Sequence, residues 1–489
     1  MANPHSVIAR AKNQIRRVLP KNRFARSVSV LAGGTAAGQF IVIAASPALT
    51  RLYSPEDFGL LAVFSALLGI LGVIASLRYQ LAIPLPESDE EAAHVVVLGL
   101  IIVAAMSLLA TVLVIFFAQP IADLFNTPAL ASYLWLLPLG LLLGGIYGVF
   151  SYWAIRVKAF TPIARTKLTQ SITMVGVQLG GYLLGPVALI LGQVTGQAAG
   201  ASSLGALTIR NRWAVFRAIR WRDIRAATRR YVRFPIYSTW GGLFNTAGSQ
   251  LPPILFAILF SPAAAGIYMI AHRVLAMPMS LIGKAIADVF LSSAAEARRN
   301  GTLAPLVADI HAKLAHIAMP PALILILAGP DLFAFVFGAD WRQAGEFAQW
   351  MAPWVYLVFI TSPLSTLFSV LEKQAQGMLF QGILLVTRGG GLILGAYLGD
   401  IMLAVALFAG GSALCWLGFL VWIIRASGNP WKALWLPTFH ALVLGALIVT
   451  PLAMFYSVPH DLATGWFAAI LATLLFTALR YSVLLKRAW

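Results

Sequence analysis

The stretch VVVLGLIIVAAMSLLATVLVIFFA, residues 95–118, contains no charged side chain. The hydrocarbon core of a bilayer is about 30 Å thick, and roughly 20 apolar residues in an α-helix cross it. Only α-helices and closed barrels satisfy their backbone hydrogen bonds inside lipid. Barrel strands alternate apolar and polar residues, and this run does not. The stretch therefore predicts a membrane-spanning helix.

Similar apolar stretches recur along the whole chain. The predicted spans lie near residues 27–50, 58–80, 93–118, 130–155, 163–184, 186–208, 235–260, 264–290, 306–328, 346–370, 377–398, 401–425, 432–455 and 464–485. Of the 489 residues, 60% are hydrophobic and 11% are charged, with a mean hydropathy of +0.84. This composition excludes an ordinary soluble protein. We expect an all-α polytopic membrane protein with about fourteen transmembrane helices, and twelve is the competing count.

The positive charges between the spans fall almost entirely in every other gap. With a cytoplasmic N-terminus, the cytoplasmic side receives the cations of residues 10–26, the nine arginines of residues 210–233, and both C-terminal cations. The opposite side keeps only Arg51 and Arg342. This asymmetry obeys the positive-inside rule and favours an even number of spans with both termini in the cytoplasm. Since the net charge of +18 sits beside apolar spans, we expect anionic membrane lipids as partners and no nucleic acid.

Two short segments of the chain resemble each other. Leu52-Tyr53-Ser54-Pro55-Glu56-Asp57-Phe58-Gly59 follows the first span, and Leu259-Phe260-Ser261-Pro262-Ala263-Ala264-Ala265-Gly266 follows the seventh. This repeat predicts two pseudo-symmetric six-helix lobes around a central cavity, as in many transporters. The expected parts are a basic cytoplasmic segment at 1–26, an N-lobe at 27–208, a basic cytoplasmic linker at 209–234, a C-lobe at 235–425 and two peripheral helices at 426–489.

Two polar segments are expected on the cytoplasmic side. The acidic segment at 86–91 predicts a solvated loop. The basic linker is able to form a surface helix whose arginines surround apolar side chains at or near the lipid, namely Trp213, Phe216, Ile219 and Ile224.

Charged residues at membrane depth are the candidate functional residues. Such a charge costs at least about 2.5–3.5 kcal/mol on insertion scales, so it is retained for a reason. Arg273 and Arg388 fall near the middle of the eighth and eleventh spans. Lys284 follows Arg273 by about three helical turns, which would place both on one face of a continuous helix. Arg78, at the end of the second span, is a candidate for the cytoplasmic mouth of a cavity.

Two interpretations of the buried arginines remain open at this stage. They are either structural cations bonded to carbonyls or carboxylates, or they line a wet cavity that receives an anionic group. Carboxylates within the spans are too scarce to pair with every cation, which favours the second interpretation. A guanidinium fork suits phosphate oxygens. The sequence contains no catalytic or metal-ligating pattern, so we expect neither an enzyme nor a cofactor.

Several segments resemble a known family. They are residues 31–39 (LAGGTAAGQ), 47–59 (PALTRLYSPEDFG), 77–86 (LRYQLAIPLP), 271–278 (AHRVLAMP) and 284–290 (KAIADVF). These segments look like those of the bacterial polysaccharide-transporter family. That family includes the Wzx-type O-antigen and exopolysaccharide flippases of the multidrug/oligosaccharidyl-lipid/polysaccharide (MOP) superfamily.

The resemblance implies a transporter of the bacterial cytoplasmic (inner) membrane that works by alternating access. Its implied substrate is an oligosaccharide linked to undecaprenyl diphosphate, moved from the inner to the outer leaflet for surface polysaccharide biosynthesis. A polysaccharide polymerase and the chain-length or export machinery are further implied partners. Arg273 lies in a matching stretch, whereas Arg388 matches no motif. A MATE-like small-molecule exporter and a membrane-embedded polysaccharide polymerase or ligase remain as alternative functions.

Overall fold

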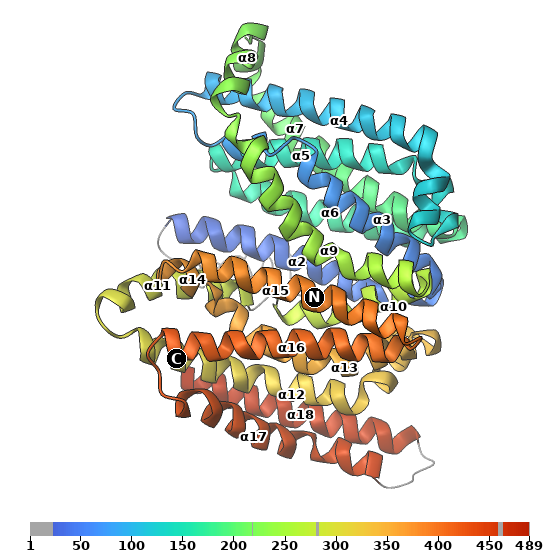
Figure 1. The fold of residues 1–489 in the computed structure, drawn as a ribbon, viewed down its shortest axis with the longest axis vertical. Coiled ribbons are helices and arrows are strands. Elements are labelled where there is room, and N and C mark those ends of the chain that lie inside the picture. The colour runs from blue at the N-terminus through green and yellow to red at the C-terminus, as the bar shows by residue number, and fades with distance from the viewer. Residues whose placement is uncertain (1–22, 218, 280–282, 458–462, 489) are drawn as a thin grey trace, which may run out of the picture. The chain divides into compact units, whose positions relative to one another are not determined.

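The computed structural model describes residues 23–217, 219–279, 283–457 and 463–488 (Figure 1). Of the predicted basic segment at 1–26, residues 1–22 lie outside the described part of the chain. The longer helices are α2 (Arg23–Leu52), α3 (Pro55–Ile74), α4 (Asp89–Leu124), α5 (Leu136–Arg156), α6 (Phe160–Gly180), α7 (Pro186–Arg217), α8 (Trp221–Arg230), α9 (Thr239–Leu259), α10 (Pro262–Pro278), α11 (Lys284–Arg299), α12 (Leu303–Phe337), α13 (Arg342–Thr361), α15 (Gln374–Tyr397), α16 (Ile401–Ala426), α17 (Lys432–Ser457) and α18 (Ala463–Ala488). Shorter helical turns are η1 (Tyr79–Ala82), η4 (Phe234–Ser238), η6 (Ala339–Trp341), η7 (Ser362–Thr366) and α14 (Leu367–Val370).

The structure confirms an all-α polytopic membrane protein. Among the described residues, 10 helical segments are long and apolar enough to cross a membrane, and no strand is present. Each predicted span coincides with a long helix, except that the span at 264–290 is divided between α10 and α11. The exact count of fourteen spans stays a prediction, because the helices α6, α7 and α9 and the shorter α10 are not among those 10.

The chain divides into two compact units. Unit 1 contains residues 1–45, 64–122 and 128–250, and unit 2 contains residues 46–63, 123–127 and 251–489. In unit 1, α7 packs against both α5 and α6. In unit 2, α12 packs against α13 and α17, and α17 packs in turn against α18 (Figure 1). The lobe boundaries expected from the sequence remain predictions.

In unit 1, the acidic loop is partly fixed by a buried arginine. The guanidinium of Arg156, at the end of α5, donates to the carboxylate of Asp89 at 3.1 Å, to the carbonyl of Pro86 at 2.6 Å and to the carbonyl of Glu87 at 3.2 Å. Charge-assisted hydrogen bonds of this kind are among the stronger ones in proteins. The structure adds to the expected solvated loop that Arg156 holds its backbone, while Glu87 and Glu90 remain exposed.

The linker is helical over most of its length, and two of the apolar residues expected at or near the lipid, Phe216 and Ile224, pack against protein instead. Helix α7 extends to Arg217, and the ring of Phe216 packs against that of Trp153 at a centroid distance of 5.3 Å. Ile224 of α8 is buried within the protein. The side chain of Trp213 lies outside the described part of the structure. The sequence pattern identified the amphipathic helix correctly but could not show that its apolar face had a protein surface to cover.

In unit 2, both copies of the sequence repeat begin a helix in the same way. Ser54 and Asp57 cap the start of α3 reciprocally, since each side chain accepts a hydrogen bond from the backbone N–H of the other residue. The Ser261 hydroxyl accepts from the N–H of Ala264 at the start of α10. Side-chain oxygens at this position satisfy helix donors that otherwise have no partner. Proline at the next position has no N–H to satisfy, so Ser-Pro is a suitable helix start in both copies.

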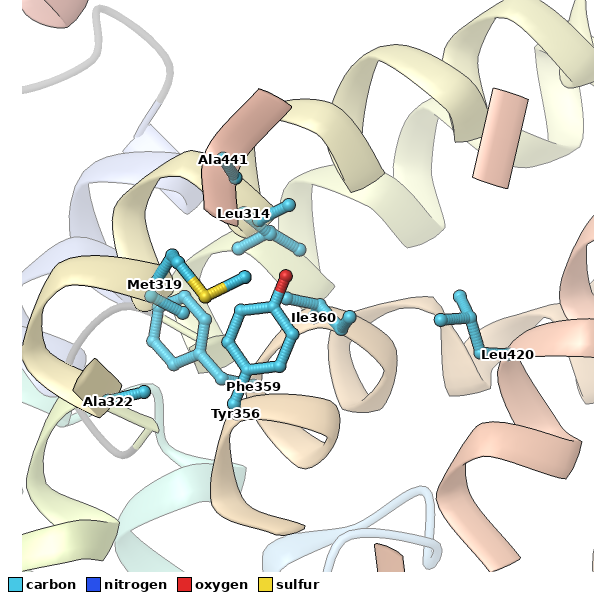
Figure 2. Packing of buried hydrophobic residues seen from close by; sticks show 10 residues of the cluster. Leu314, Met319, Ala322, Tyr356, Phe359, Ile360, Leu420 and Ala441 are labelled. Carbon is cyan, nitrogen blue, oxygen red and sulfur yellow. The ribbon is translucent and has the colours of Figure 1, made fainter. Parts of the chain in front are cut away.

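A hydrophobic cluster joins helix α17 to the rest of unit 2 (Figure 2). Leu314 and Met319 of α12 lie beside Tyr356 and Phe359 of α13, and Ala441 of α17 completes the packing. A second cluster, formed by Ala328, Leu452 and Ala469, joins α12 to both α17 and α18. The two C-terminal helices are therefore packed into unit 2 through buried apolar contacts.

Candidate substrate-binding site

Arg388 is held in place by two neighbouring helices of unit 2. It projects from α15, and its Nε donates to the hydroxyl of Ser412 on α16 at 3.3 Å. Its guanidinium carbon lies 5.0 Å from the ring centroid of Trp354 on α13, a cation–π arrangement. No carboxylate of the described residues forms an ion pair with it. The protein thus orients the guanidinium while leaving its charge unneutralised.

An aromatic stack surrounds this arginine. The ring of His272 on α10 stacks on Tyr268 at 5.5 Å and on Trp354 at 6.4 Å, measured between centroids. Phe408 of α16 meets Trp354 edge-on at 5.2 Å. Tyr268 and Trp354 are buried, whereas His272 keeps an exposed surface. The stack makes a rigid wall on which Arg388 and His272 present polar groups.

Arg273 follows His272 on α10 and is half-buried. Within the described part of the chain, its guanidinium has neither a hydrogen-bond acceptor nor a carboxylate partner. A guanidinium carries five N–H donors, and leaving them unsatisfied at membrane depth is unfavourable. This geometry gives no support to the interpretation of Arg273 as a structural cation, and it leaves the side chain available to an anionic ligand.

The chain from Arg273 to Lys284 does not form one continuous α-helix. Helix α10 ends at Pro278 and Lys284 begins α11, while Met279 and Gly283 have π-helical hydrogen bonding. The expectation of one continuous α-helix from Arg273 to Lys284 is therefore corrected, while the expectation that both project from one face stays a prediction. The Lys284 side chain lies outside the described structure, so its role as a binding residue remains a prediction.

Arg78 belongs to unit 1 and is held in an unusual backbone conformation. Leu77 and Arg78 both have positive φ angles, 48° and 63°. The guanidinium packs on Gly242 of α9, where a Cβ would lie 2.0 Å from the Nη2 of Arg78. The Nε of Arg78 is buried without a hydrogen-bond partner among the described residues. Only glycine at position 242 leaves space for this side chain.

The structure thus brings some candidate residues together and leaves others apart. Arg388 and His272 both contact Trp354, and Arg273 is the next residue on the same helix as His272. Arg78 lies in the other unit, and its relation to these residues remains a prediction. Sequence reasoning missed the two residues that position Arg388, namely Trp354 and Ser412. No local sequence pattern identifies them, because a tryptophan or serine within an apolar span is also typical of residues that only pack in the protein core.

A family described as "Polysaccharide biosynthesis protein" matches residues 48–346. The chain belongs to this family. A search of curated protein sequences gave no match. The resemblance to polysaccharide transporters inferred from residues 31–93 and 235–290 is confirmed by this result.

Solved structures of transporters are similar to the whole chain. "Lipid II flippase MurJ, inward closed conformation" aligns with a TM-score of 0.72 at 14% identity, covering 94% of this chain and 99% of that one. An inward-facing multidrug resistance MATE family transporter of the MOP superfamily aligns with a TM-score of 0.63 at 13% identity, covering 82% of this chain and 94% of that one. A MOP superfamily transporter from Pyrococcus furiosus, described as having a binding pocket of reverse polarity, aligns with a TM-score of 0.55 at 14% identity, covering 82% of this chain and 96% of that one. At these identities the matches show the fold, which is that of MurJ and the MATE transporters.

Proposed function

We propose that this protein is a flippase for lipid-linked oligosaccharides. Its substrate would be a sugar repeat unit on undecaprenyl diphosphate, moved from the inner to the outer leaflet of the bacterial cytoplasmic membrane. The observation that carries the proposal is the pair of guanidinium groups on Arg273 and Arg388. Both lie in predicted spans of a polysaccharide biosynthesis protein, and neither has a carboxylate partner among the described residues.

The chemistry of the substrate fits such a site. A diphosphate with attached sugars is anionic and strongly hydrated, so it cannot cross hydrocarbon unaided. Guanidinium groups replace its hydration with bidentate, charge-assisted hydrogen bonds to phosphate oxygens. His272 and the hydroxyl of Ser412 stand beside Arg388 as further polar groups. The polyprenyl tail would remain in the lipid while the two lobes expose the polar head to each leaflet in turn.

The remaining parts of the proposal follow from the charge distribution and the family. Both termini would lie in the cytoplasm of a bacterial cell, because the basic loops alternate with the spans. The protein would act as a transporter and not as an enzyme, in surface polysaccharide (O-antigen or exopolysaccharide) biosynthesis. A polymerase and the chain-length or export machinery would receive the flipped unit.

The alternative functions lack a comparable observation. A MATE-like exporter of cationic drugs would need carboxylates in its binding site, and none contacts Arg273, Arg388 or His272 among the described residues. A polymerase or ligase would need an external segment to build an active site. The loop between α12 and α13 consists only of Gly338 and the single turn of η6.

The proposal is tested in a bacterial strain that lacks its own flippase and accepts this protein. The measurements are surface polysaccharide and the amount of lipid-linked repeat unit retained in the inner leaflet. We expect Arg273→Gln and Arg388→Gln each to lower the surface polysaccharide at least about tenfold, because each removes a charge from the site. Arg425→Gln is the matched control, since Arg425 also stacks on a tryptophan, at 5.0 Å, but lies at the end of α16. Full activity of both site variants at normal protein level would refute the proposal.

A further inference from the structure

Helix α8 presents a strongly basic face that the transport mechanism does not use. Arg222, Arg225 and Arg229 are exposed and fall within one sector of about 60° on the helix, and Trp221 extends that sector to about 100°. Trp221 is 70% exposed. Among the described residues, these three arginines have no hydrogen-bond or ion-pair partner.

The opposite face of α8 is fixed to unit 1. Ile224 and Ala227 are buried, and Arg230 forms an ion pair with Glu91 at 3.0 Å. The Tyr79 hydroxyl donates to the carbonyl of Thr228 at 3.2 Å. Burial raises the pKa of Tyr79, so this phenol remains a protonated donor. The orientation of the basic face is therefore set by the protein.

The position of α8 along the membrane normal follows from its contact with α4. Helix α4 is kinked at Phe117, and the part before the kink, residues 89–116, is about 42 Å long, beyond the hydrocarbon thickness of about 30 Å. Its first turn contains Asp89, Glu90 and Glu91, which belong in the polar layer. Because Glu91 and His94 contact α8, that helix lies at the level of the lipid headgroups. Figure 1 shows α8 crosswise to α4 and projecting past it.

The basic face of α8 lacks a negative partner within the described protein, and an anionic membrane surface is able to supply one. Arginines three and four positions apart repel one another by about 0.2–0.5 kcal/mol per pair. A nearby anionic membrane surface attracts each arginine more strongly than this repulsion. Tryptophan is also enriched at the interface between membrane and water. Since α8 begins only four residues after the end of α7, the chain cannot carry it far from the membrane.

We infer that the face formed by Trp221, Arg222, Arg225 and Arg229 binds the headgroups of anionic phospholipids in the cytoplasmic leaflet. The contact would anchor the segment that connects the two halves of the transporter to the membrane surface. It is independent of the proposed substrate, because it lies outside the predicted spans. A soluble acidic protein or an RNA is the competing kind of partner.

The test uses the full-length protein in liposomes with a single fluorescent label on α8. Cys415→Ser removes the one native cysteine, and Ala226→Cys places the label at an exposed position beside the basic face. Quenching is compared between phosphatidylglycerol and phosphatidylcholine, each brominated near the glycerol end of its chains and used at the same mole fraction. We expect the anionic lipid to quench at least about threefold more strongly, and high salt to remove the difference.

Two triple variants assign the effect to this face. Arg222→Gln, Arg225→Gln and Arg229→Gln together should equalise quenching by the two lipids, and the protein should still fold because these side chains bond to nothing. The matched control is Lys158→Gln, Arg165→Gln and Arg299→Gln, which removes the same charge from exposed positions also predicted to be cytoplasmic. The control should keep the preference for the anionic lipid.

Four results would each overturn the inference. Equal quenching by both lipids would show that charge does not attract the helix to the membrane. Quenching by neither lipid would show that the face is turned to the cytoplasm, as a soluble partner requires. Persistence of the preference in the α8 triple variant, or its loss in the control, would show that other charges are responsible.

Discussion

Gly59 and Gly266 hold helices α3 and α10 together by a reciprocal backbone contact within unit 2. A Cβ on Gly59 would lie 1.9 Å from the carbonyl oxygen of Pro262, and a Cβ on Gly266 would lie 2.0 Å from that of Pro55. The two glycines occupy the same place in the two copies of the sequence repeat. The repeat is therefore a pair of surfaces that pack on each other, and small residues make this close helix approach possible.

Gly59→Ala and Gly266→Ala should each destabilise the protein, by about 2–4 kcal/mol, because the new methyl group meets backbone that cannot move aside. Thermal unfolding in detergent measures the effect. The control is Gly72→Ala on the same helix α3, where a Cβ would meet nothing within 4 Å. This change should be neutral or slightly stabilising, since alanine favours helix more than glycine does. Equal stability of all three variants would contradict the close contact.

Arg156→Lys should destabilise the loop at 86–89 although it keeps the positive charge. Lysine cannot form the three hydrogen bonds that the guanidinium donates to Asp89, Pro86 and Glu87. We expect a loss of about 2–3 kcal/mol in unfolding free energy and faster proteolysis within the loop. Arg165→Lys, at an exposed position on α6, should change neither measurement. If the Arg156→Lys protein resisted proteolysis as well as the wild type, the hydrogen bonds of the Arg156 guanidinium would not be needed to hold the loop.

Gly242→Ala should impair transport by displacing Arg78. The methyl group would lie 2.0 Å from Nη2 of Arg78, so the guanidinium would have to leave its present position. If Arg78 forms the cytoplasmic mouth, transport should fall at least about tenfold at a normal protein level. Gly241→Ala is a close control, because a Cβ on this neighbouring glycine meets nothing within 4 Å. Normal transport by the Gly242→Ala variant would remove Arg78 from the proposed site.

Arg388→Lys should also reduce transport, which separates a guanidinium requirement from a requirement for charge alone. Lysine loses both the hydrogen bond to Ser412 and the planar stacking on Trp354. We expect about a tenfold loss for Arg388→Lys and a smaller loss for Ser412→Ala, which removes only the orienting hydroxyl. Cys415→Ser, one helical turn from Ser412 on α16, should retain transport. If Arg388→Lys transported normally, a simple positive charge would be sufficient.

Prediction from the sequence succeeded where the membrane itself imposes the pattern. The run at 95–118 lies within α4, and the repeat at Ser54-Pro55 and Ser261-Pro262 marks two helix starts, because lipid and helix caps act on local sequence. Prediction failed at the span 264–290, which the structure divides between α10 and α11. It also failed at Ile224, where the apolar face of α8 covers protein. Both errors depend on contacts or backbone geometry that a periodic pattern does not contain.

The sequence by itself determined that the chain is a helical membrane protein, and it singled out Arg273 and Arg388 as cations within predicted spans. Hydrophobic length and charge asymmetry are local properties, and the bilayer converts them directly into spans. The tertiary structure alone decided how Arg388 is oriented, since Trp354 and Ser412 come from two other helices and meet it only in the packed fold. It alone decided that Gly59 and Gly266 touch. Contacts between distant segments depend on the three-dimensional packing of side chains, which no short stretch of sequence specifies.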